Sequence, residues 1–71
     1  MYLCVITYQY EDREPVEIPN LPTSKKLAEW QAAESDRLFV DNAHVLGARV
    51  YSEADYRTHE QRRLAEALVI S

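Results

Sequence analysis

The stretch Tyr2–Tyr10 constrains the fold more than any other part of the chain, because it is a strand pattern that starts apolar on both faces. The second face begins with Leu3 and Val5 and becomes polar at Gln9. Such a strand is expected at the centre of a sheet, covered on both sides. Its first face would carry Tyr2, Cys4, Ile6, Tyr8 and Tyr10.

Length and net charge narrow the class of protein. The 71 residues make one domain, residues 1–71. A core of this size rarely contributes more than about 3–5 kcal/mol of net stability, so association with a partner would add to it. Twelve acidic residues against eight basic ones give a net charge of −4. That balance excludes a nucleic-acid binder of the usual basic kind, and we expect no direct nucleic-acid contact.

The cysteine count and the start of the chain bear on its location. Cys4 is the only cysteine, whereas extracellular chains this short normally need several disulfides. The apolar run at residues 1–6 is too short to span a bilayer and lacks the basic leading segment of a signal peptide. We therefore expect a cytoplasmic protein with no membrane contact.

Residues 11–22 are acidic and rich in proline. Four acids and one base give this segment a charge of −3, and it holds all three prolines. Pro15 and Pro19 cannot donate to a hydrogen-bond ladder, so residues 16–18 form at most a short edge strand. The segment is either a solvated loop or an acidic docking surface.

A first helix is expected after this segment. Thr23 or Ser24 can cap it, and it runs to about Ser35. Helical periodicity then turns one broad face inward and another outward. The inward face carries Leu27, Trp30 and Ala33, and the outward face carries Lys25, Glu29, Ala32 and Asp36.

Residues 37–51 allow two interpretations. In the first they form a β-hairpin with strands at 38–40 and 45–51. In the second the preceding helix continues until Gly47 ends it. Apolar runs this short do not decide between the two. The hairpin would turn three side chains inward: Leu46, Ala48 and Val50.

Ser52 begins a final helix with clear local signals. It precedes Glu53 and Asp55, acids that suit a helix start, in an arrangement that resembles a capping box. Residues 57–63 contain no apolar side chain, so much of this helix should face water. Residues 68–70 are either its last turn or a short terminal strand. Its expected anchors are Tyr56, Leu64, Ala67 and Leu68.

Together these elements predict an α+β fold, a small antiparallel sheet with two helices packed on one face. The order strand, helix, hairpin, helix is similar to that of a truncated ferredoxin-like domain. This similarity is architectural and implies no activity.

No catalytic, metal or cofactor chemistry is predicted. Cys4 would need an imidazole beside it to act as a nucleophile, and it lies in the most apolar strand, so an inert buried thiol is expected. Asp55 and His59, four residues apart on a helix, are too few for a structural metal site and should contact each other. A single glycine leaves no phosphate-binding loop. We therefore predict a protein that is not an enzyme and holds no cofactor.

Aromatic side chains point instead to a binding surface. Five tyrosines and Trp30 are many amphipathic rings for one small sheet to bury, and these residue types often anchor protein interfaces. The rings either lie exposed beside the acidic segment or cover the edge of the core. The predicted partner-binding residues are Tyr8, Tyr10, Glu11, Asp12, Glu14 and Glu17.

Two short strings within residues 17–31 are similar to a known family. They resemble a stretch of the small RNA-polymerase inhibitors of certain coliphages. In its small size, its acidity and its lack of catalytic motifs, the chain also resembles phage-encoded inhibitors as a class, anti-CRISPR proteins among them. The strings are Glu17-Ile18-Pro19 and Leu27-Ala28-Glu29-Trp30-Gln31.

The sequence therefore predicts a small acidic inhibitor or regulator that binds a larger protein or ribonucleoprotein complex and occludes a basic surface on it. The inhibitor would be of the anti-defence or host-takeover type. The alternative is a self-associating structural or regulatory domain, a homodimer paired through a sheet edge with no outside target.

Overall fold

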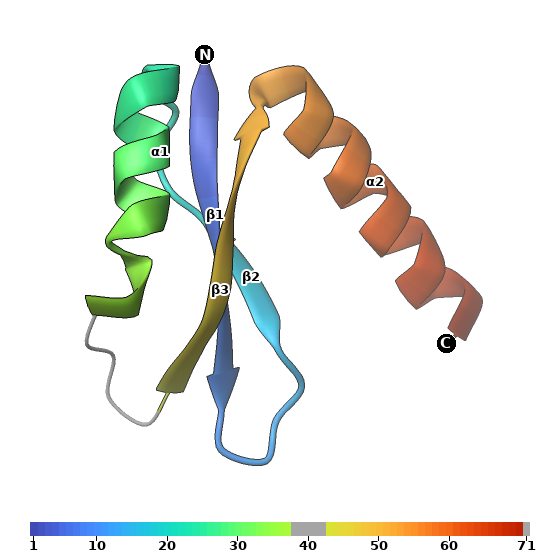
Figure 1. Ribbon diagram of the computed structural model, residues 1–71. Coiled ribbons are helices and arrows are strands. Elements are labelled where there is room, and N and C mark those ends of the chain that lie inside the picture. The colour runs from blue at the N-terminus through green and yellow to red at the C-terminus, as the bar shows by residue number, and fades with distance from the viewer. Residues whose placement is uncertain (38–42, 71) are drawn as a thin grey trace.

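The computed structural model describes residues 1–37 and 43–70. Two strands come first, followed by a helix, a short 3₁₀ turn, a third strand and a long final helix (Figure 1). The predicted strand at residues 38–40 lies outside the described residues. The elements are β1 (Tyr2–Tyr10), β2 (Val16–Pro19), α1 (Lys25–Ala33), η1 (Ser35–Arg37), β3 (Ala43–Ser52) and α2 (Glu53–Ile70).

The three strands form one antiparallel sheet in the order β2-β1-β3. The prediction that Tyr2–Tyr10 is the central strand is confirmed. β2 is a short edge strand as predicted, but it extends one residue beyond the predicted 16–18 and ends at Pro19. Because β2 follows β1 directly, the order of elements differs from the predicted strand, helix, hairpin, helix order. Within β3 the interpretation as a continued helix is wrong, since Gly47 lies inside the strand.

A register shift interrupts the pairing of β1 with β3. Thr7 pairs with Gly47, but the next residue, Tyr8, pairs with Val45, so Leu46 is an extra residue on β3. Leu46 was predicted to point inward and is 53% exposed, because a bulge of this kind breaks the alternation on its strand.

The two helices contact opposite faces of the sheet (Figure 1). On the first face, Cys4, Ile6 and Tyr8 form the core cluster beside α1. On the second face, Leu3 and Val5 are buried on the side of α2. The α+β prediction with a small antiparallel sheet and two helices is confirmed, but the expectation that both helices share one face is not. One helix on each side is needed because β1 is apolar on both faces.

The face that α1 turns to the sheet also differs from the prediction. Ala28 is fully buried and Ala32 packs on the core cluster, whereas Leu27 and Trp30, expected inside, are exposed. Small alanines let the helix lie close to the sheet, while helical periodicity alone favours the larger residues as the core face. The predicted cap is confirmed at Ser24, whose Oγ accepts a hydrogen bond of 3.2 Å from the backbone N–H of Leu27.

α2 follows β3 without a connecting loop. The Oγ of Ser52 accepts a hydrogen bond of 3.1 Å from the backbone N–H of Asp55, which confirms the predicted cap. The helix runs through Ile70, so residues 68–70 are helical and do not form a strand. The predicted anchors Leu64 and Leu68 are 55% and 77% exposed, because α2 diverges from the sheet along its length (Figure 1). Within the described residues no helix is long and apolar enough to cross a membrane.

The orientation of α1 predicts how two alanine substitutions differ. Ala28→Leu should lower the free energy of unfolding by about 1–3 kcal/mol, because its larger side chain has no space against the sheet. Ala33→Leu on the exposed side of the same helix should change it by less than about 0.5 kcal/mol. Urea denaturation measures both values. Equal losses for the two variants would contradict the observed orientation.

Candidate functional site

The hairpin that joins β1 to β2 carries the exposed acidic residues. Its turn is closed by a hydrogen bond of 2.8 Å from the N–H of Arg13 to the carbonyl of Tyr10. A second bond of 3.3 Å runs from Nε2 of Gln9 to the carbonyl of Arg13. Glu11 has a φ of 36°, in the left-handed region that favours glycine. The turn is therefore an ordered, locally strained structure rather than a featureless loop.

The acidic tip consists of Glu11, Asp12 and Glu14, which are all exposed. No salt bridge within the described residues includes any of the three carboxylates. Tyr10, half-buried at the end of β1, lines a shallow depression together with Glu11, Asp12 and Arg13. The structure thus brings four of the six predicted partner-binding residues to one end of the molecule.

The other two predicted residues lie elsewhere. Tyr8 belongs to the buried core cluster, so its ring is not presented at the surface. Glu17 lies on the second face of the sheet and is held by side chains of α2. Glu17 pairs with Thr7 of β1 and therefore points to the face opposite Tyr8. Tyr8 shares its face with Tyr10 but lies within the core cluster beside α1.

Glu17 is the centre of a polar network that joins β2 to α2. Its Oε2 lies 2.7 Å from Nε2 of His59 and 3.4 Å from Nη1 of Arg63. The imidazole of His59 also stacks on the ring of Tyr51, with centroids 5.2 Å apart and planes 21° from parallel. The predicted contact of His59 with Asp55 is therefore replaced by one to a residue 42 positions away. Local helical spacing gives no signal for such a partner.

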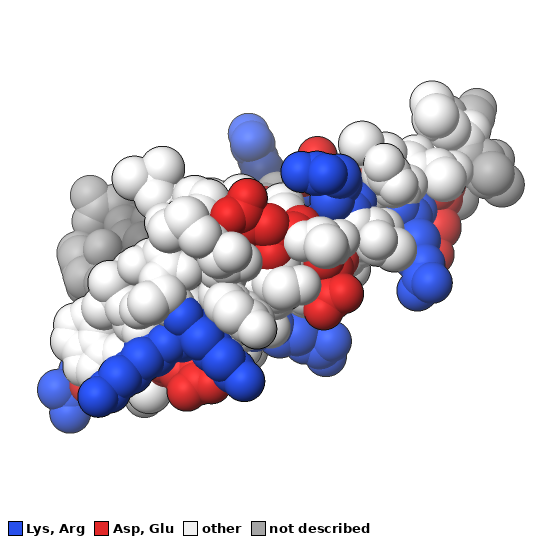
Figure 2. Space-filling model, turned by 90° about the horizontal axis from the view of Figure 1, so that it is seen from above, with Lys and Arg blue, Asp and Glu red and all other residues white. Residues whose placement is uncertain are grey.

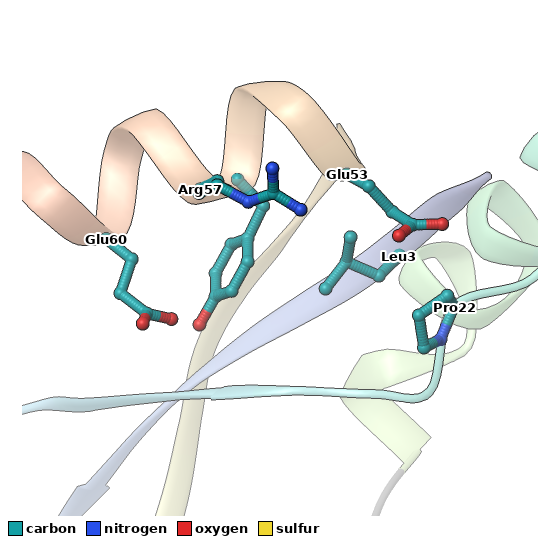
Figure 3. Close-up of a pocket in the computed structure, with 6 residues that line it drawn as sticks. Leu3, Pro22, Glu53, Arg57 and Glu60 are labelled. Atoms are coloured by element: carbon teal, nitrogen blue, oxygen red, sulfur yellow. The ribbon is translucent and has the colours of Figure 1, made fainter.

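A second polar site lies where α2 begins (Figure 3). Leu3 and Pro22 form its apolar side, and Glu53, Arg57 and Glu60 reach toward it from the helix. Tyr56 completes the lining. Burial raises the pKa of the Tyr56 hydroxyl, and a hydrogen bond to Glu60 and the charge of Glu60 raise it further. These side chains surround Leu3 at the junction of α2 with the sheet.

An exposed apolar surface lies on the outer side of α1. Leu27 and Trp30 line a shallow depression with Lys26 and Ser24, and the Trp30 side chain is 60% exposed. Helical periodicity does not predict this exposed surface, because it assigns the large apolar residues Leu27 and Trp30 to the core.

Cys4, the one candidate nucleophile of the sequence, lies in the core of the sheet. Cys4 is fully buried, and that burial raises the pKa of its thiol, which disfavours the nucleophilic thiolate. Within the described residues, no group of three or more His, Cys, Asp or Glu side chains is placed to hold a metal ion. Figure 2 views the molecule from above, from the end opposite the β1–β2 turn, and shows acidic and basic side chains interspersed there rather than one broad field of a single sign.

No family model matches the chain, and no curated protein or solved structure does either. The acidic tip is therefore the candidate site on its geometry and charge.

The strained backbone of Glu11 generates a prediction. Glu11→Gly should raise the free energy of unfolding by up to about 1 kcal/mol, because glycine adopts a positive φ without steric conflict. Asp12→Gly is the matched control, since the φ of Asp12 is not positive, and it should lower stability by about 0.4–1 kcal/mol. Thermal and urea denaturation compare the two. A loss of stability in Glu11→Gly as large as in the control would contradict the strain.

Proposed function

We propose that this chain is a protein-binding inhibitor or regulator that presents its acidic tip to a basic surface on a larger protein or ribonucleoprotein complex. The observation that carries the proposal is the set of three exposed tip carboxylates, none of which has an ion-pair partner among the described residues. Like charges so close together repel each other in the free protein, and a cationic partner relieves that repulsion.

Two further features support binding over a purely solvated turn. The tip holds Glu11 in a strained conformation, and strained residues cluster at functional sites. Beside it Tyr10 offers a half-buried aromatic ring, a residue type that often anchors interfaces. In this arrangement the acids steer association and the ring contributes buried apolar area.

The most concrete form of the proposal is an anti-defence or host-takeover inhibitor that acts in the cytoplasm. What supports it is the small size, the net charge of −4 and an acidic projection able to compete with a polyanion for a basic surface. Such an inhibitor acts by occlusion and needs no cofactor and no catalytic step.

The second candidate is self-association through β3. This ten-residue strand is at one edge of the described sheet, and an edge strand can pair with a second copy. The bulge at Leu46 and the exposed Arg49 oppose such pairing, since both features are common ways to protect an edge. Sedimentation separates the candidates, because self-association requires a dimer whereas the proposed inhibitor functions as a monomer.

The test compares two triple variants of equal charge. Glu11→Gln, Asp12→Asn and Glu14→Gln together neutralise the tip, while Glu29→Gln, Asp55→Asn and Glu66→Gln neutralise three exposed acids on the helices. Each is used as tagged bait in a lysate of the cells in which the chain acts, and the captured complex is then purified for kinetics.

Wild type and the helix variant should capture the same complex, and the tip variant should bind it at least about tenfold more weakly. Added salt should slow association more than it speeds dissociation. Capture of no partner, or equal binding by the folded tip variant, would show that the acidic tip is not the docking surface.

A further inference from the structure

The sheet face opposite α1 is only partly covered, because α2 diverges from it toward the C-terminus (Figure 1). Two adjoining depressions lie on this face and share Thr7 and Arg49. The first, about 250 Å³ in volume, is built from all three strands and α2. The second continues along β3 past Gly47, where no atom outside residues 46–48 of the described chain lies within 4 Å of the position that a Cβ would take. The first depression is lined by Val5, Thr7, Glu17, Arg49, Tyr51 and His59.

The charges around this pocket are not balanced. Glu17 is the one acidic side chain in the lining, and His59 and Arg63 already hold its carboxylate. Arg49 is exposed at the pocket and takes part in no salt bridge within the described residues. With Arg63 counted beside the lining, two arginines accompany one carboxylate, so the site carries an excess of one positive charge in a chain whose net charge is −4.

Hydroxyl groups add hydrogen-bond donors beside the arginine. Neither Thr7 nor Tyr51 has a side-chain hydrogen bond within the part of the chain that the structure describes. Both hydroxyls are thus able to donate to a ligand. The stack of His59 on Tyr51 fixes the orientation of the ring that carries one of them.

We infer that this pocket binds a small oxyanion, either a phosphate or a carboxylate. The planar fork of Arg49 supplies the charge-assisted hydrogen bonds, and the hydroxyls of Thr7 and Tyr51 complete the set of donors. Glu17 does not repel the ligand strongly, because its carboxylate lies 3.4 Å from the guanidinium of Arg63, whose positive charge offsets it. A cationic ligand fits less well, since the one carboxylate that would receive it is already occupied. The inference is independent of the acidic tip, which lies at the β1–β2 turn.

The experiment is an NMR titration with inorganic phosphate and, in a second arm, with acetate, both at constant ionic strength. Chloride is the control for simple screening. Saturable shifts are expected at the amides of Thr7 and Tyr51 and at Nε of Arg49. Saturation by phosphate alone identifies a phosphate site, and saturation by acetate alone identifies a carboxylate site.

The variants assign the binding to Arg49. Arg49→Gln should weaken it at least about tenfold, and Arg49→Lys, which keeps the charge but loses the fork, should give an intermediate affinity. Arg57→Gln, an exposed arginine at the other α2 pocket, should leave the affinity unchanged. An unchanged amide spectrum elsewhere shows that each variant is folded. The inference is overturned if no shift saturates, if chloride produces the same shifts, or if Arg49→Gln binds as well as wild type.

Discussion

β1 is apolar on both of its faces, and the rest of the structure is arranged to keep those faces away from water. Five of the six buried apolar residues in the described chain belong to this strand, and Ala28 of α1 is the sixth. The strand is paired along both edges, so its backbone groups are satisfied by β2 and β3 while its side chains need a cover above and below. Each helix supplies one cover.

The two helices are held on the sheet by different kinds of interaction. α1 lies close to the sheet because alanines form its inner face, and its large apolar residues are left outside. α2 has no fully buried residue among those described and is held mainly by the network of Glu17, His59 and Arg63 and by the ring of Tyr51. A helix attached by polar contacts as far as Arg63 can diverge beyond that point, and the oxyanion pocket lies between the attached part of the helix and the sheet.

Features set by local chemistry were predictable from the sequence, whereas features set by distant partners were not. The central strand, the short proline-limited edge strand and the caps at Ser24 and Ser52 follow from neighbouring residues. Which residues of α1 face the sheet depended on how closely the helix approaches it. Helical periodicity gives no information about that distance. The acidic tip was predictable from composition. The burial of Tyr8 depended on how far the core extends along β1, and the position of Glu17 depended on its distant partner His59.

Native-state amide hydrogen exchange tests the central role of β1 most directly. Residues 3–8 should exchange slowest, at the free energy of global unfolding, because both edges of the strand are paired and both faces are covered. Residues 64–68 of α2 should exchange at a much lower free energy, because their side chains are exposed. Fast exchange across residues 3–8, or equal protection of the two segments, would contradict a structure organised around the central strand.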